Sequence, residues 1–68
     1  MIANDLKKIR MQKFLMNKKE FAKLLGIAEQ QYLRYENGLG VPSLETCLKI
    51  AATLGCTVNE IWFFSESH

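Results

Sequence analysis

The sequence predicts a single all-α domain of five helices, and three observations lead to this prediction. Apolar residues recur at spacings of three and four, whereas the period-2 alternation of a half-buried strand is hard to find. Asn, Ser and Thr caps and Gly breaks divide the chain into five segments. With 68 residues and no long linker, the chain has room for one domain, residues 1–68, folding alone or as a dimer.

The first two helices are predicted on either side of a connection at residues 13–17. A helix from about residue 4 to residue 14 has lysines outside and an inward stripe of Ile2, Leu6 and Ile9. The second helix opens at Asn17, which can cap its first turn while Glu20 completes a capping box. Gly26 ends it, because a left-handed backbone is cheap only without a Cβ. Its inward residues are Phe21, Ala22, Leu24 and Leu25.

The third helix follows at once, from about residue 29 to residue 36, and Asn37-Gly38 ends it. It is predicted to bury Tyr32 and Tyr35, whose hydroxyl groups need partners or solvent. A loop over residues 39–42 then leads to the next helix.

The last two helices begin at hydroxyl caps. Ser43, after Pro42, caps a helix that Gly55 breaks, with an inward face of Leu44, Cys47, Leu48, Ala51 and Leu54. Thr57 and Glu60 form a second capping box, which starts a short helix through Val58, Ile61 and Trp62. Residues 63–68 are predicted to be frayed or to depend on a partner.

Composition argues against several classes of protein. No apolar run approaches the roughly 18 residues that span a bilayer, and the N-terminus lacks a signal-peptide core, so we expect a cytoplasmic protein. Cys47 and Cys56 lack the spacing and His partners of a zinc site, and we interpret both as reduced hydrophobes, with a disulfide as the alternative.

An enzyme is not expected. The single histidine, His68, is terminal, and no nucleophile–base set or Gly-rich phosphate loop can be assembled from the sequence. No cofactor, metal or small-molecule ligand is expected either.

Positive charge is concentrated in the first half of the chain. Residues 1–38 hold eight Lys and Arg against four Asp and Glu, a net charge of +4. Residues 39–68 hold one against three, a net charge of −2. The first half is therefore suited to meet an anion, although solvation of a helical surface is the alternative for the lysines.

Residues 18–38 combine two short helices and a tight glycine turn, which is a geometry for binding DNA. The first helix would lie across the phosphates and the second would enter the major groove, whose width of about 12 Å accepts a helix. Glutamine can pair with adenine and arginine with guanine, so Gln30, Gln31 and Arg34 are candidates for base reading. An ordinary solvated helix face is the alternative. Glu29 could accept a bond from cytosine, but a role with the helix dipole takes precedence.

The sequence resembles the XRE family of phage repressors and Cro/C1-type regulators, from about residue 6 to residue 62. The matching positions are Phe21-Ala22, Leu25-Gly26-Ile27, Tyr32, Tyr35-Glu36-Asn37-Gly38 and Pro42-Ser43-Leu44. The resemblance implies a lambda-repressor-like domain whose second and third helices form the helix-turn-helix. It also implies a small transcriptional regulator, favouring a repressor, that binds double-stranded DNA as a homodimer on a two-fold operator.

The resemblance further implies roles for single residues. Lys18, together with Lys19, takes the position near phosphate at the start of the second helix. Asn37 and Gly38 would present backbone amides and a side-chain donor to a phosphate. Arg10 and Glu36 match a charge pair that fixes the third helix and leaves Arg10 partly able to face a phosphate.

Three departures from the family pattern are visible. Ala28 replaces the usual Ser or Thr cap of the third helix, at a cost of about 1 kcal/mol. The connection from Lys13 to Asn17 is one residue longer than usual, and Tyr32 and Tyr35 are larger than the usual aliphatic residues.

Three consecutive aromatic residues near the C-terminus exceed what one short helix can bury. We interpret Trp62, Phe63 and Phe64 as a homodimer surface. The alternative is a protein-interaction module of the same fold, such as an antitoxin or an anti-repressor partner.

Overall fold

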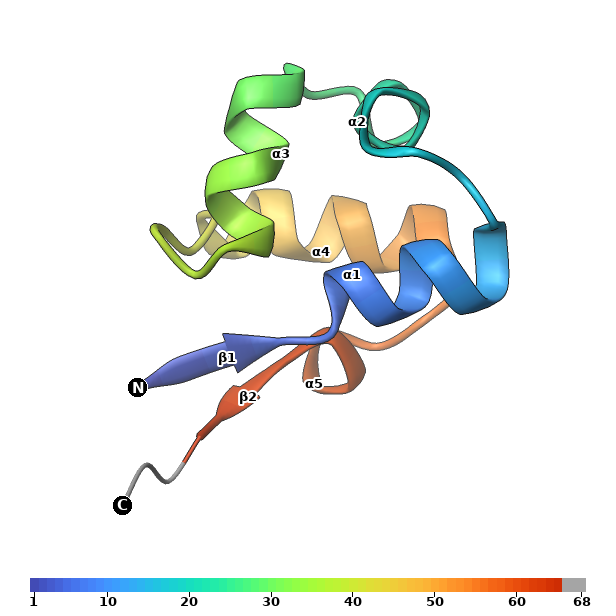
Figure 1. Cartoon of the computed structure of the whole chain (residues 1–68). Helices are drawn as coiled ribbons and strands as arrows, with labels where there is room; N and C mark the ends of the chain where they lie inside the picture. Colours follow the sequence, from blue (N-terminus) through green and yellow to red (C-terminus); the bar gives the residue numbers. More distant parts are fainter. Residues whose placement is uncertain (66–68) are drawn as a thin grey trace.

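The computed structural model describes residues 1–65, and this part of the chain forms five α-helices, one π-helical turn and a two-stranded sheet. Helices α2 and α3 lie at one end of the molecule, the sheet and α5 lie at the other, and α1 and α4 lie between them (Figure 1). The predicted five-helix domain is confirmed. The elements are β1 (Ile2–Asn4), α1 (Leu6–Ile9), η1 (Arg10–Phe14), α2 (Lys18–Leu25), α3 (Glu29–Glu36), α4 (Leu44–Leu54), α5 (Val58–Ile61) and β2 (Trp62–Phe64).

The predicted caps are present at the helix starts. The Asn17 side chain accepts a hydrogen bond from the Glu20 amide at 2.8 Å, and the Glu20 carboxylate accepts one from the Asn17 amide at 3.1 Å. Thr57 and Glu60 form the same reciprocal box before α5. Ser43 accepts from the Thr46 amide at 3.3 Å and starts α4. Side chains that bond to backbone amides three residues away therefore determine where α2, α4 and α5 begin.

The core lies where the helices meet. The Phe21 ring stands edge-on to Tyr32, with 5.4 Å between ring centroids, and tilts against Phe14 at 5.6 Å. The buried apolar residues are Leu6, Ile9, Phe21, Ala22, Tyr32, Cys47, Ile50, Ala51, Leu54, Ile61 and Trp62.

The predicted inward face of α4 was partly wrong. Leu44 and Leu48 are exposed, whereas Ile50 is buried. The buried stripe of α4 consists of Cys47, Ile50, Ala51 and Leu54, a helical i, i+3, i+4, i+7 pattern rotated from the predicted one. The sequence offered apolar residues on two neighbouring stripes, and only tertiary packing decides which stripe is covered. Leu24 of α2 is likewise exposed rather than inward.

The small sheet was not predicted. It changes the predictions for the first residues of the chain and for residues 63 and 64. Strands β1 and β2 pair antiparallel, with Ile2 opposite Phe64 and Asn4 opposite Trp62. The first helix therefore begins at Leu6 rather than near residue 4, and Ile2 is an exposed strand residue. Three-residue strands are too short to reveal a period of two, and their partners lie at opposite ends of the sequence.

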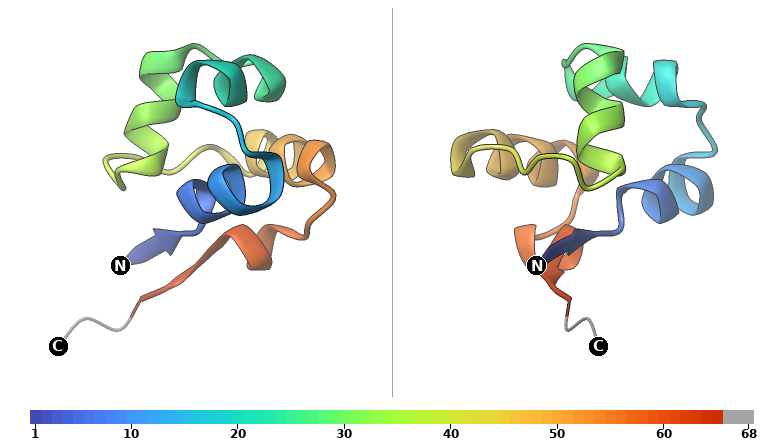
Figure 2. Two further views of the ribbon diagram at one scale, coloured as in Figure 1. Left: turned by 45° about the vertical axis from the view of Figure 1, so that its right-hand side comes forward. Right: turned by 60° about the vertical axis from the view of Figure 1, so that its left-hand side comes forward.

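Of the two predictions for residues 63–68, fraying was wrong for residues 63 and 64, which belong to β2, and for Ser65, which bonds to Met1. Residues 66–68 lie outside the described residues, and dependence on a partner stays a prediction. Strand β2 places the C-terminal end of the described chain beside the N-terminus, and three views of the ribbon agree on this (Figures 1 and 2). The Ser65 amide extends the pairing by donating to the Met1 carbonyl at 2.8 Å.

The long connection between the first two helices is taken up by a π-helical turn. Residues Arg10–Phe14 form η1, and a π-turn holds one residue more than the α-helical turn it replaces. Leu15 then adopts a left-handed conformation, with φ 52°, which reverses the chain towards α2. The extra residue in this connection is therefore accommodated by η1 and by the reversal at Leu15.

Both cysteines are free thiols, as predicted. Cys47 is buried and donates to the Pro42 carbonyl at 3.4 Å, and burial raises the pKa of its thiol. None of the helices in residues 1–65 is long and apolar enough to cross a membrane.

Candidate nucleic-acid interface

Two lysines stand at the exposed start of α2. Lys18 and Lys19 occupy its first turn, directly after the Asn17 cap. A cation at a helix N-terminus opposes the helix dipole, so these lysines do not stabilise the helix that carries them. The stabilising charge of this turn is Glu20, which the capping box holds in place. Lys18 and Lys19 are thus available for an external anion.

A tight turn joins α2 to α3. Gly26 has a left-handed backbone with φ 74°, and the Ile27 amide returns to the Ala22 carbonyl at 3.1 Å. A side chain at Gly26 would meet no atom within 4 Å, so the backbone conformation rather than space requires glycine. Ala22 is buried where the two helices approach. This turn therefore brings α3 directly after α2 and reverses the chain between them.

The outer face of α3 carries all four of the predicted base-reading residues. Glu29, Gln30, Gln31 and Arg34 are exposed, whereas Tyr32 on the same helix is fully buried. Gln30 and Arg34 are four positions apart and Gln31 and Arg34 are three apart, so their side chains project from one face. Within residues 1–65, these three side chains take part in none of the side-chain hydrogen bonds or ion pairs.

The start of α3 has no side-chain cap. Ala28 occupies the N-cap position with an extended backbone, and it offers no acceptor to the first amides of the helix. Glu29 is the acidic residue of the first turn, where its charge favours the helix dipole. The end of α3 next to α2 therefore presents unpaired backbone donors.

A buried polar cluster, which we call the clamp, holds α3 against the first helix. It consists of Arg10, Met16, Tyr32 and Glu36. Arg10 Nε lies 3.3 Å from Glu36 Oε2, with side chains 8% and 4% exposed, so the predicted ion pair is present. Arg10 Nη1 donates to the Met16 carbonyl at 2.9 Å, and the Tyr32 hydroxyl donates to the same Glu36 oxygen.

The clamp changes the interpretation of two residues. Arg10 was predicted to remain partly able to face a phosphate, but its side chain is buried and committed to Glu36 and Met16, which removes it from the phosphate contacts. The Tyr32 hydroxyl finds its partner inside the protein. Burial, together with the hydrogen bond to the Glu36 carboxylate, raises the pKa of the Tyr32 phenol.

The C-terminal end of α3 also departs from the prediction. The Asn37 amide donates to the Leu33 carbonyl at 3.0 Å, and the Gly38 amide donates to the Tyr35 carbonyl at 3.1 Å. Both amides are therefore used within the helix cap, so Gly38 does not offer its amide to a phosphate. The exposed Asn37 side chain is the donor that remains at this end.

A further contact here was missed by sequence reasoning. Asn4 Nδ2 donates to the Tyr35 carbonyl at 2.8 Å and attaches β1 to the end of α3. Asparagine is common in polar loops, and no local signal separates a residue that caps a distant helix from one that faces solvent.

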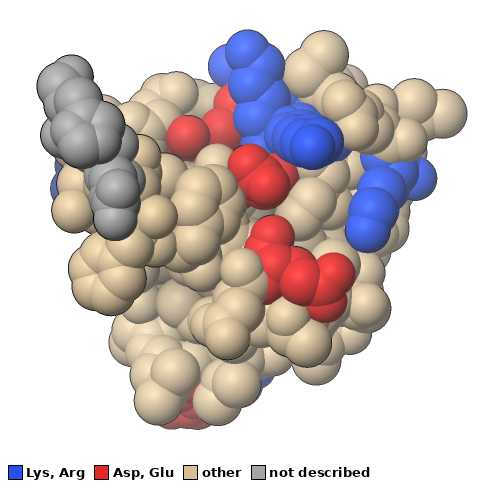
Figure 3. Space-filling model, turned by 90° about the horizontal axis from the view of Figure 1, so that it is seen from below, with Lys and Arg blue, Asp and Glu red and all other residues tan. Residues whose placement is uncertain are grey.

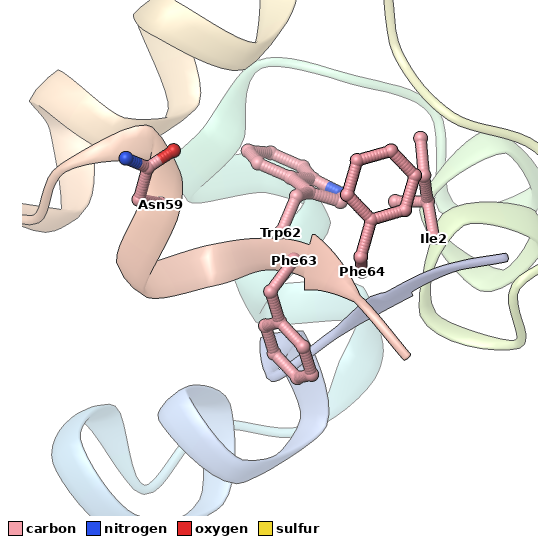
Figure 4. A pocket seen from close by; sticks show the side chains of 5 residues that line it. All are labelled: Ile2, Asn59, Trp62, Phe63 and Phe64. Atoms are coloured by element: carbon pink, nitrogen blue, oxygen red, sulfur yellow. The ribbon is translucent and has the colours of Figure 1, made fainter. Parts of the chain in front are cut away.

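The three C-terminal aromatic residues do not form one surface. Trp62 is only 7% exposed, because it closes the core beneath the sheet, and it is therefore corrected from a surface residue to a core residue. Phe63 and Phe64 are exposed, and they point to opposite sides of β2 (Figure 4). The predicted dimer surface thus reduces to separate phenylalanine side chains.

The comparisons with known proteins agree with this geometry. A family model described as helix-turn-helix matches residues 6–61. This chain belongs to the XRE-type helix-turn-helix family. It is also 32% identical over 68 residues to the cryptic phage CTXphi transcriptional repressor RstR of Vibrio cholerae. The alignment covers 100% of this chain but only 60% of the length of that repressor.

Proposed function

We propose that this protein binds double-stranded DNA sequence-specifically and acts as a transcriptional repressor. In this proposal α3 enters the major groove and α2 lies across the backbone. The relative RstR is named as a transcriptional repressor, and the shared family supports a DNA-binding regulator rather than an enzyme.

The observation that carries the proposal is the contrast between the two faces of α3. One face is fixed by the buried clamp, and the other presents Gln30, Gln31 and Arg34 without partners among the described residues. A rigid helix with free bidentate donors and acceptors is suited to reading base edges, since each good pair contributes about 1–3 kcal/mol of discrimination.

Different residues have different roles in the proposed complex. Arg34 pairs with guanine, and Gln30 and Gln31 pair with adenine; Glu29 serves the helix dipole first and contacts a cytosine second. Lys18, Lys19 and the Asn37 side chain contact phosphates and set the register. Binding occurs as a homodimer, which places two half-sites about 34–36 Å apart on a two-fold operator.

Gel shifts at several salt concentrations test the proposal. We expect a salt-sensitive specific band on genomic fragments from the source organism of the protein. Arg34→Ala should weaken specific binding by about 1–3 kcal/mol and relax one position of the site. Lys18→Ala should weaken binding to all sequences and lower the salt slope by about one. Absence of a specific band would contradict the proposal and favour a protein-interaction module.

A further inference from the structure

The small sheet leaves one edge of β2 without a partner strand. Within residues 1–65 the sheet consists of β1 and β2 alone, so each strand has a single neighbour. The Ser65 amide donates to the Met1 carbonyl at 2.8 Å, which makes these two residues a bonded pair of the ladder. Phe64, opposite Ile2, belongs to the next pair, and bonded and non-bonded pairs alternate in an antiparallel ladder. The N–H and C=O groups of Phe64 therefore point away from β1.

A hollow of about 350 Å³ lies beside β2, and a buried donor is directed towards it. The hollow is lined by Ile2, Asn59, Trp62, Phe63 and Phe64. Trp62 is only 7% exposed, yet its Nε1 has no acceptor in the described part of the chain. The indole nitrogen is directed towards Phe64 and Ile2, and Phe64 itself is 82% exposed (Figure 4). An acceptor can therefore reach Nε1 once the Phe64 ring turns aside.

The free edge and the hollow together fit an extended peptide with uncharged side chains. A strand added beside β2 would pair with the outward N–H and C=O groups of Phe64. Every second side chain of that strand would stand on the face that carries Trp62 and Phe64. An uncharged acceptor suits the buried indole, because a buried charge without a partner is costly. Seen from the sheet end, charged side chains gather on one part of the surface, and much of the remainder carries no charge (Figure 3).

In the longer relative RstR, further chain adjoins this end of the fold. The alignment spans 100% of this chain and 60% of RstR, so the remainder of RstR precedes or follows the aligned residues. Both ends of the described chain lie at the sheet, away from α2 and α3 (Figures 1 and 2). Polypeptide outside the shared domain therefore starts beside β1 or β2, which makes the sheet end a place where additional polypeptide can pack.

We propose that the outer edge of β2 binds an extended, uncharged peptide segment of a partner protein, which adds a third strand to the sheet. One apolar side chain of the segment fills the hollow, and a neighbouring oxygen accepts a hydrogen bond from Trp62 Nε1. Because β2 and α3 lie at opposite ends of the molecule, the segment can bind while α3 is on DNA (Figure 1). The site thus connects the protein to a partner without displacing it from its operator.

Random peptides displayed on phage and selected against the full chain provide the probe. We expect the enriched peptides to alternate apolar and polar residues. In a synthetic copy of the best binder, N-methylation of every second backbone amide removes the donors along one edge. Methylation in one register should weaken binding about tenfold or more, and methylation in the other should leave it nearly unchanged, because only one edge faces β2. Equal effects in the two registers, or no enriched peptide, would overturn the inference.

Phe64→Pro and Phe64→Ala form a matched pair of protein variants. Both remove the ring, but only proline removes the outward amide. Phe64→Pro should therefore bind the selected peptide about tenfold more weakly than Phe64→Ala does. The Ser65 amide should stay protected from hydrogen exchange in both variants, since neither change removes its bond to Met1. Equal peptide binding by the two variants would contradict strand addition.

Trp62 provides an independent readout because it is the one tryptophan of the chain. Its indole N–H resonance should shift when the selected peptide binds. A resonance that the peptide leaves unmoved would place the peptide elsewhere, and a resonance that shifts with protein concentration alone would assign the edge to a second copy. Either result would overturn the inference.

The last arm adds DNA to the peptide complex. Saturating peptide should leave the salt-sensitive specific band unchanged, and competition between peptide and DNA would contradict a site at the sheet end. Peptide binding itself is measured without DNA. Failure of the chain to bind DNA would therefore overturn the proposed function alone.

Discussion

The structures at the two ends of the molecule depend on contacts of different range in the sequence. At the helix-turn-helix end, both ends of α2 are set by residues within four positions of them, namely the box of Asn17 with Glu20 and the turn at Gly26. At the sheet end, Ile2 pairs with Phe64, across almost the whole chain. The first end is specified locally and the second by tertiary contacts. The clamp is a tertiary contact of the helix-turn-helix end, because it holds α3 against η1 and the chain that follows η1.

The largest expected effect tests whether the clamp holds α3 against η1. Glu36→Ala should lower the free energy of unfolding by about 3–5 kcal/mol, because it leaves the Arg10 guanidinium and the Tyr32 hydroxyl buried without their shared acceptor. Urea denaturation measures the change. The matched control is Glu45→Ala, which removes an exposed pair with Lys49 and should change stability by about 0.5 kcal/mol or less. Equal effects from the two variants would show that the clamp does not hold α3.

Alkaline pH should favour the unfolded chain because of Tyr32 in the clamp. The pKa of Tyr32 is raised above its ordinary value of 10.0, so the folded protein keeps a proton that the unfolded chain has lost. The contribution of Tyr32 to the free energy of unfolding is complete below pH 10.0. It declines as the pH rises above 10.0, by at most about 1.4 kcal/mol per pH unit. Tyr32→Phe should remove this part of the slope in urea titrations at successive pH values. A variant with the wild-type slope would contradict the assignment.

A gain of stability should come from the one helix start at this end that lacks a cap. Ala28→Ser places an acceptor before the free amides of α3 and should raise the free energy of unfolding by about 1 kcal/mol. Thermal unfolding followed by circular dichroism measures this change. Ala28→Val, which cannot cap, serves as the control and should not stabilise. Loss of stability in Ala28→Ser would indicate that packing rather than capping decides this position.

The sequence predicted the helix-turn-helix closely because its determinants are local. The capping residues and Gly26 act within one turn of the helix ends that they define, so composition and spacing reveal them. The outer face of α3 followed from the same periodicity. The charge pair of Arg10 with Glu36 came from the family resemblance rather than from spacing.

The remaining features depend on distant contacts. Nothing near Leu44 in the sequence separates it from Ile50, and the packing of α4 alone exposes the first and buries the second. The burial of Arg10 and Trp62 likewise depends on Glu36 and on the sheet, respectively. The amides of Asn37 and Gly38 became unavailable because the helix cap uses them. The phosphate roles that the resemblance implied for Arg10 and Gly38, and the surface role inferred for Trp62 from its aromatic neighbours, failed for this reason.

The central claim is that the outer face of α3 reads bases while the start of α2 holds the backbone. Selection of bound sites from random double-stranded DNA, carried out with the wild type, Arg34→Ala and Lys18→Ala, tests it most directly. We predict a two-fold motif for the wild type, loss of preference at one position of each half-site for Arg34→Ala, and an unchanged motif with weaker binding for Lys18→Ala. No enriched motif for the wild type, or the same loss of preference in both variants, would contradict the claim.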